Sequence, residues 1–161
     1  MAHEEIPIVP VEPKLELLYS SIIEITPPLN VGNTPLGERR IINITGGSFA
    51  GPRLTGKILP GGADWQIIRS DDTAEVEARY TLETNDGALI YITNWGYRHG
   101  PPEVIKKLSS GSDVNPQEYY FRTTPKFETG SADYDWLNKI VSIAVGERRK
   151  DHVIITAYEV K

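Results

Sequence analysis

The stretch EVEARYTLETNDGALIYITNWGY, residues 75–97, carries the clearest β-strand signal in the sequence. Apolar and polar side chains alternate from residue 75 to 84, which is the period of a strand with one buried and one solvated face. The apolar positions are Val76, Ala78, Tyr80 and Leu82. Asn85, Asp86 and Gly87 follow, and such residues supply the positive φ angles of a tight hairpin. Because the apolar run at 88–97 returns directly, the stretch predicts an antiparallel β-hairpin.

The same alternation recurs along most of the chain. Seven further strands are predicted at residues 15–25, 39–49, 53–59, 65–70, 118–128, 139–147 and 152–160. Helix is confined to 101–108, which begins with two prolines suited to a first turn, and to a helical or 3₁₀ turn at 132–138. Closure removes the exposed edges of consecutive antiparallel strands. We therefore predict an all-β fold, a single closed or nearly closed antiparallel β-barrel of about eight or nine strands with one or two short helices.

The chain divides into an arm and one domain. With 161 residues it is long enough to bury a core of its own, and residues 15–161 are predicted to form the barrel domain. Residues 1–14 carry Pro7, Pro10 and Pro13, a spacing of three that excludes a central strand. We predict that this segment is an extended arm, which lies on the surface or across a partner subunit.

Composition excludes several classes of site and partner. Cysteine is absent, and the three histidines lie far apart without a metal-ligating neighbour, so no thiol chemistry and no metal site are expected. The net charge of −5 argues against a nucleic-acid partner. The N-terminus lacks the features of a signal peptide, and no apolar run approaches the roughly 20 residues of a membrane span. We expect a cytoplasmic protein without a membrane partner.

A glycine-rich segment partly matches the pattern of a phosphate-binding loop. Gly51, Gly56 and Lys57 have the spacing of such a loop, but Ile58 stands where serine or threonine would bind magnesium. The residues that follow, LPGG, cannot open a helix whose N-terminus would hold phosphate. The sequence therefore predicts no bound nucleotide, and we expect no cofactor.

The segment GGADWQIIRS, residues 61–70, places an acid beside an indole at the start of a strand. Adjacent strand residues face opposite sides of a sheet, so only one of the two points into the barrel unless a bulge follows the glycines. We expect Asp64 to face the interior and Trp65 to cover the barrel mouth.

Two segments mix charged and aromatic residues, as do pockets that are apolar with a few polar groups. The segments are 75–84, which contains Arg79, and 118–130, which contains Arg122. A solvated barrel wall is the alternative for each residue. A third segment, 134–138, either lines the pocket or plugs one barrel end. The candidate ligand-binding residues are Trp65, Arg79, Tyr91, Tyr120, Arg122, Trp136 and Asn138, and the candidate catalytic residues are Asp64 and Glu128.

Four stretches together resemble a known family. They are GGSFAGPRLTGKILPGGADWQ (46–66), EARYTLETNDGALIYITNWG (77–96), YYFRTTPKFETG (119–130) and YDWLN (134–138). Their order and content resemble domain of unknown function family 3237, also called uncharacterised protein family 0311. The resemblance implies a β-barrel similar to that of allene oxide cyclase, found in bacterial and fungal proteins, and it implies no established reaction.

Two hypotheses about function follow. In the first, the barrel binds a small aromatic or planar anionic ligand, with Arg79 or Arg122 meeting its negative charge. Asp64 or Glu128 would then act as acid or base in a cofactor-independent isomerisation, cyclisation or hydrolysis. In the alternative, the protein is a structural or interaction module that forms a homodimer and carries out no ligand chemistry.

Overall fold

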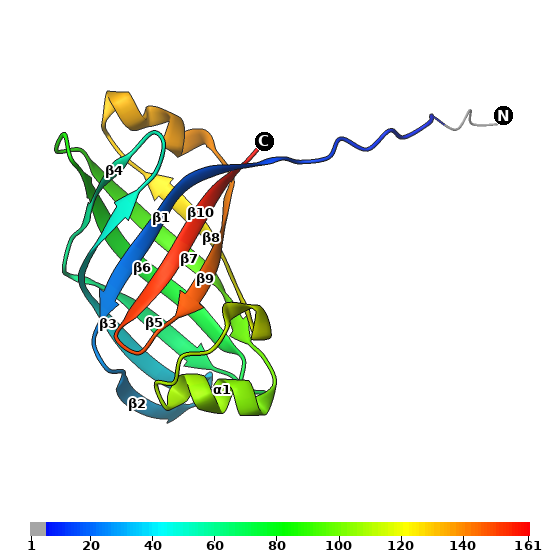
Figure 1. Ribbon diagram of the computed structural model, residues 1–161, viewed down its shortest axis with the longest axis vertical. Coiled ribbons are helices and arrows are strands. Elements are labelled where there is room, and N and C mark those ends of the chain that lie inside the picture. Colours follow the sequence, from blue (N-terminus) through cyan, green and yellow to red (C-terminus); the bar gives the residue numbers. More distant parts are fainter. Residues whose placement is uncertain (1–5) are drawn as a thin grey trace.

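The structure is a computed structural model that describes residues 6–161 (Figure 1). Its strands are β1 (Leu15–Ile25), β2 (Leu29–Thr34), β3 (Gly37–Ala50), β4 (Thr55–Ile58), β5 (Gly62–Ile68), β6 (Ala74–Thr84), β7 (Leu89–His99), β8 (Tyr120–Glu128), β9 (Ser142–Arg148) and β10 (His152–Val160). Its helices are α1 (Pro102–Ser109) and the 3₁₀ helices η1 (Pro116–Glu118) and η2 (Ala132–Lys139). Within this range no helix has both the length and the apolar character needed to span a bilayer.

The strands close into an antiparallel barrel with eight positions. Around the ring they run β1, β10, β9, β8, β7 and β6, then a position shared by β4 and β5, then β3, which pairs with β1 again. β4 pairs with residues 82–84 of β6, and β5 pairs with residues 74–79 of the same strand. β2 pairs with β3 alone and lies outside the ring. The predicted all-β antiparallel barrel is therefore confirmed, with two strands beyond the eight positions.

One strand, β2, was not predicted from the sequence. β2, with the sequence LNVGNT, has side chains that are exposed or half-buried throughout. An alternation of buried and solvated positions is therefore missing, and its glycine and two asparagines are typical of turns. The nine predicted strands correspond to the other nine observed ones, and the two predicted helical segments correspond to α1 and η2.

One end of the barrel is packed with large side chains. They are Leu18, Tyr19, Phe49, Leu82, Ile90, Phe127 and Leu137, all buried. The ring of Tyr19 meets those of Phe49 and Phe127 edge to face, with centroids 5.5 and 6.2 Å apart. η2 lies across this end, at the top of Figure 1, and contributes Leu137. This end therefore has a solid core.

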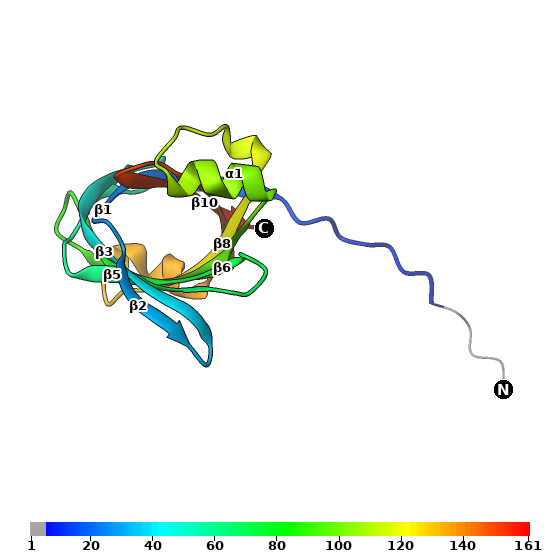
Figure 2. The same ribbon diagram turned by 90° about the horizontal axis from the view of Figure 1, so that it is seen from below.

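At the other end, several inward-facing positions are occupied by alanine. Ala74 and Ala78 of β6 and Ala144 of β9 are buried here, and each fills less of the barrel than the leucines and phenylalanines of the packed end. α1 lies along the rim of this end (Figure 2) and adds Val104 and Leu108 to the core. Space inside the barrel is therefore left at the α1 end.

Glycine is required where β3 turns against β1. Gly47 has a φ of +141°, and a Cβ there would lie 2.0 Å from the carbonyl oxygen of Ile22. The pairing of β1 with β3 shifts register between Glu24 and Ile25, next to this point. Gly47 therefore lies at a corner of the coiled sheet, where the backbones of β1 and β3 approach closely.

The N-terminal segment leaves the barrel beside the last strand. Lys14 and Lys161 exchange two backbone hydrogen bonds of 2.8 and 2.7 Å. From there residues 6–13 run away from the barrel as an exposed segment without helix or strand (Figure 1). The predicted arm comprised residues 1–14, of which 1–5 lie outside the described residues.

Candidate functional site

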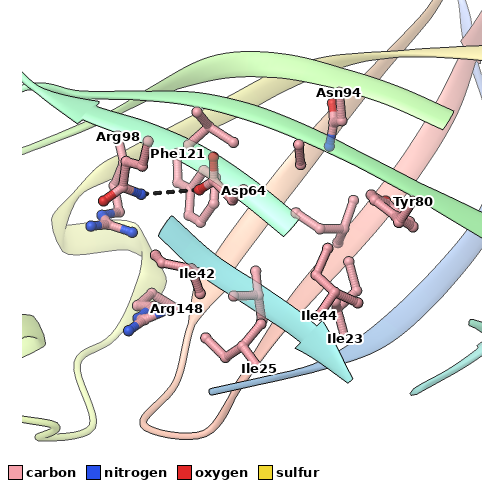
Figure 3. Close-up of a pocket in the computed structure, with 15 residues that line it drawn as sticks. Ile23, Ile25, Ile42, Ile44, Asp64, Tyr80, Asn94, Arg98, Phe121 and Arg148 are labelled. Carbon is pink, nitrogen blue, oxygen red and sulfur yellow. Dashed lines mark hydrogen bonds between the residues drawn. The ribbon is translucent and has the colours of Figure 1, made fainter. Parts of the chain in front are cut away.

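A cavity occupies the α1 end of the barrel interior (Figure 3). It holds about 470 Å³ of space free of protein atoms, part of which is open to solvent. Its apolar lining consists of Ile23, Ile25, Ile42, Ile44, Val76, Ala78, Phe121, Val153 and Ile155. Its polar lining consists of Asp64, Gln66, Tyr80, Asn94, Arg98 and Arg148. Small-molecule sites have this composition, an apolar wall with a few polar groups.

Asp64 is the acid of this lining, and hydrogen bonds hold its carboxylate in place. Oδ1 accepts from the backbone N–H of Glu77 at 2.9 Å, where the ladder between β5 and β6 is interrupted. Oδ2 accepts from Nε2 of Gln66 at 3.1 Å (dashed line in Figure 3). Gln66, 1% exposed, accepts in turn from Nε of Arg40 at 3.2 Å. The carboxyl group therefore has a fixed position at the cavity wall.

The surroundings of Asp64 favour its protonated form. Burial raises the pKa of the Asp64 carboxyl above its ordinary value, because a charge is poorly solvated there. The hydrogen bonds from Glu77 and Gln66 and the charges of Arg98 and Arg40 oppose this rise without cancelling it. A positioned carboxyl group can accept a proton when ionised and donate one when protonated.

Three arginines from different strands gather around Asp64. They are Arg40 of β3, Arg98 of β7 and Arg148 of β9. Burial, together with repulsion from Arg148 and Arg40, lowers the pKa of Arg98 to about 10, and burial also lowers the pKa of Arg148. Both remain cations at neutral pH. The site therefore has three positive groups for one carboxylate.

Arg98 and Arg148 lie near Asp64 but are not in direct contact with any acid within residues 6–161. Neither forms an ion pair there, and their guanidinium nitrogens donate no hydrogen bond. Arg98 lies over the ring of Phe121, 5.8 Å from its centroid. Half-buried guanidinium groups without a counter-ion are costly, and an anionic ligand would offset that cost.

Asp64 and Trp65 take opposite sides of β5. Asp64 lines the cavity, as expected, whereas Trp65 is 38% exposed on the outer wall and does not cover the barrel mouth. The strand alternation alone explains this placement, because successive side chains point to opposite faces.

The two predicted anion-binding arginines lie on the outer wall. Arg79 is exposed and pairs with Glu77 at 3.5 Å. Arg122 is exposed and donates to the carbonyl of Phe121 at 2.9 Å. Each alternates with a buried neighbour, Tyr80 or Phe121, that points inward. The prediction that Arg79 and Arg122 lie in the pocket is therefore wrong. The arginines that line the cavity are Arg98 and Arg148.

The remaining predicted site residues also lie outside the cavity. Tyr91, Tyr120 and Glu128 are exposed on the outer faces of β7 and β8. Trp136 lies in η2 at the packed end, with the guanidinium of Arg53 3.7 Å above its ring.

Asn138 has a structural role at the same end. Its side chain exchanges two 2.9 Å hydrogen bonds with the backbone of Thr129, Oδ1 accepting and Nδ2 donating. The alternative interpretation of residues 134–138, a plug with a tied turn, therefore describes their placement, and Asp64 is the predicted site residue that lines the cavity.

Several cavity residues carried a usable signal in the sequence. Ile90, Ile92, Asn94 and Arg98 share one parity along β7, so extending the alternation past the aliphatic pair places Asn94 and Arg98 inside. Arg148 shares the parity of the buried Ala144 on β9. The aliphatic Ile143 and Val145 have the opposite parity, so the alternation in the sequence places Arg148 outside.

Residues 13–160 match the family described as protein of unknown function (DUF3237). A UPF0311 protein of Rhodopseudomonas palustris is 44% identical over 150 residues, which are 92% of this chain and 98% of the relative. The crystal structure of a β-barrel-like protein from Acinetobacter baumannii superposes with a TM-score of 0.84 at 45% identity, covering 96% of this chain and all of that one.

A fungal relative is more distant. The hydroalkoxylation enzyme phnH of Penicillium herquei is 26% identical over 133 residues, which are 83% of this chain and 74% of the relative. The crystal structure of an enzyme from the same fungus has a TM-score of 0.74 at 21% identity, covering 97% of this chain and all of that one, and so shares the fold.

Proposed function

The chain belongs to the DUF3237 family, whose description assigns no function, and from the interior of its barrel we propose one. The cavity binds a small organic anion, and Asp64 transfers a proton to or from that ligand. The observation that carries the proposal is the excess of positive charge around a single carboxyl group in an apolar cavity.

The arginines suit a planar anion. A guanidinium group presents a flat fork of N–H donors that matches a carboxylate, an enolate or a phenolate. Arg98 and Arg148 are available to such a ligand, since neither is paired within the described part of the chain. The isoleucines and Phe121 then surround the apolar body of the ligand. The preferred ligand is therefore an aromatic or otherwise planar organic acid.

Asp64 suits a proton transfer that needs no redox step. Hydroalkoxylation, the reaction in the name of the fungal relative, adds an O–H group across a C=C bond. The oxygen loses a proton and forms the C–O bond, and the neighbouring carbon takes up a proton, so no electrons are gained or lost. Asp64 can accept the first proton and supply the second, while an arginine stabilises negative charge that develops on the ligand.

The anion site is tested by binding. We expect benzoate, salicylate or cinnamate to raise the melting temperature of the protein, because a ligand that binds only the folded state stabilises it by mass action. Arg98→Gln and Arg148→Gln should each weaken the effect by at least about ten-fold in apparent affinity, because a hydrogen bond to a charged group contributes roughly 1.5–3 kcal/mol. Arg79→Gln on the outer wall is the matched control. Stabilisation by none of the three acids, or equal effects in all three variants, contradicts the anion site.

We propose, as a second function of the protein, that its N-terminal segment mediates dimer formation. This proposal does not depend on the cavity residues. The apolar side chains of Ile6, Ile8, Val9 and Val11 are between 84% and 93% exposed. Prolines spaced by three favour a polyproline II conformation, which binds to grooves lined by aromatic residues. The outer wall offers such a hollow, lined in part by Trp65 and Trp95. The segment therefore suits docking into this hollow on a second copy of the chain.

This pairing predicts a change of mass in solution. Light scattering should give a dimer for the full chain and a monomer after deletion of residues 1–13, because the deletion removes the docking segment. Trp95→Ala should have the same effect from the other side of the contact. Tyr120→Ala, an exposed aromatic outside the hollow, is the control. A full chain that is already monomeric, or a dimer that survives both changes, contradicts the proposal.

A further inference from the structure

Two buried polar groups that line the cavity have no hydrogen-bond partner within residues 6–161. The hydroxyl of Tyr80 and Oδ1 of Asn94 are unpartnered among the described residues, and each side chain is 3% exposed. Both residues line the cavity. Buried polar groups in proteins are nearly always paired, so an orphaned pair calls for an explanation.

The two residues are diagonal neighbours on adjacent strands. Asn94 of β7 lies opposite Ala78 of β6, and Tyr80 is two residues further along β6 on the same inward face. Diagonal neighbours of this kind have their Cα atoms about 7–8 Å apart, and long side chains bridge that distance. One small group between the two side chains can therefore contact both.

These groups lie away from the arginines. Asn94 and Arg98 are four residues apart on β7, which separates their Cα atoms by about 13 Å. Figure 3 shows Tyr80 and Asn94 on the opposite side of the cavity from Arg98 and Arg148, with Asp64 between the two sets. A ligand that meets both sets must be elongated, with a polar group at each end.

A hydroxyl group of a ligand can form hydrogen bonds with both Tyr80 and Asn94. Burial raises the pKa of the Tyr80 phenol, so it stays neutral and can donate a hydrogen bond. The amide oxygen of Asn94 can only accept one. A ligand hydroxyl accepts from the first and donates to the second, whereas a methyl group or a hydrogen leaves both unpaired.

We propose that Tyr80 and Asn94 form a subsite for a hydroxyl group at the far end of the anionic ligand. The ligand class is then an elongated organic acid whose acidic group meets Arg98 and Arg148 and whose distal hydroxyl occupies this subsite. The inference rests on the proposed anion site, which it extends to the opposite end of the cavity.

Two pairs of commercial acids test the subsite, 4-hydroxycinnamate against cinnamate and 4-hydroxybenzoate against benzoate. By calorimetry, at least one hydroxylated acid should bind about ten-fold more tightly than its parent, because the hydroxyl satisfies two buried groups. Tyr80→Phe and Asn94→Leu should each remove most of this preference while retaining binding of the parent acid. Tyr91→Phe, an exposed tyrosine on the outer wall, should leave the preference unchanged.

A second measurement needs no ligand. Tyr80→Phe deletes an unpartnered hydroxyl, so the melting temperature of the free protein should stay the same or rise, whereas loss of a satisfied hydroxyl would lower it. The outcomes separate the two proposals. Equal binding of hydroxylated and parent acids that remains sensitive to Arg98→Gln overturns the subsite alone. Binding of none of the four acids overturns the anion site too, and a preference that survives both cavity variants overturns the assignment to Tyr80 and Asn94.

Discussion

Replacing Asp64 with asparagine is expected to lower the rate of a cavity-catalysed hydroalkoxylation by roughly 10²–10⁴-fold, the usual contribution of a positioned acid or base. A suitable probe is the ring closure of 2′-hydroxychalcone to flavanone, in which a phenol adds across an activated C=C bond. Asparagine keeps the shape of the side chain and can still accept the N–H of Glu77, so binding of benzoate should persist. Chiral chromatography supplies the measurement, because uncatalysed closure gives a racemic product.

The control for this variant is Asp133→Asn, which changes an exposed acid in η2. It should leave both rate and enantiomeric excess unchanged. A wild-type protein that gives racemic flavanone at the background rate, or an Asp64→Asn variant as active as the wild type, contradicts the catalytic role.

The pH dependence has a defined sign. If Asp64 acts as the base, the rate rises as pH increases through its pKa, which burial holds above the ordinary value of 3.8. The same shift means that the folded protein binds this proton more tightly than the unfolded chain does. The contribution of Asp64 to stability is therefore greatest below pH 3.8 and is lost as pH rises through the raised pKa. Asp64→Asn should remove both transitions.

The packed end of the barrel should respond differently to substitution. Leu82 is fully buried there, and Leu82→Ala is expected to cost about 2–5 kcal/mol of unfolding free energy, because it removes apolar contacts and leaves a hole. At about 2–4 °C per kcal/mol for a domain of this size, the melting temperature falls by roughly 4–20 °C.

Leu89→Ala is the matched control for this change. Leu89 lies near the same hairpin but is 54% exposed, so its truncation should change the free energy of unfolding by no more than about 0.5 kcal/mol. Urea titration of the three proteins measures both effects. Equal stability of Leu82→Ala and Leu89→Ala would contradict the solid packing of this end.

The fold followed from the sequence because its signals are local. The alternation in β6 and the turn at 85–87 are visible within a dozen residues, and both occur in the structure, with a positive φ at Gly87 and not at Asn85 or Asp86. β2 carries no alternation, since both of its faces are partly solvated. Because β2 pairs with β3 alone and lies outside the ring, its sequence shows no alternation of apolar and polar residues.

The site was harder to predict because it depends on closure of the sheet. Asp64 could be placed inside from its strand, but the partners of an interior residue come from across the barrel. Arg98 and Arg148 are 50 residues apart in sequence and come together only when β7, β8 and β9 are adjacent. Arg79 and Arg122 have aromatic neighbours, which is typical of pocket residues, but strand parity places both arginines on the outer wall.

The seam of the barrel joins the first strand to the last. β1 pairs with β10 from Leu15 opposite Val160 to Glu24 opposite His152. A ribosome makes β1 first, so its edge toward β10 stays unpaired until β10 has been synthesised. The cavity likewise takes Arg148 and Ile155 from the last part of the chain. Neither the closed wall nor the complete cavity can therefore exist on a nascent chain that lacks β10.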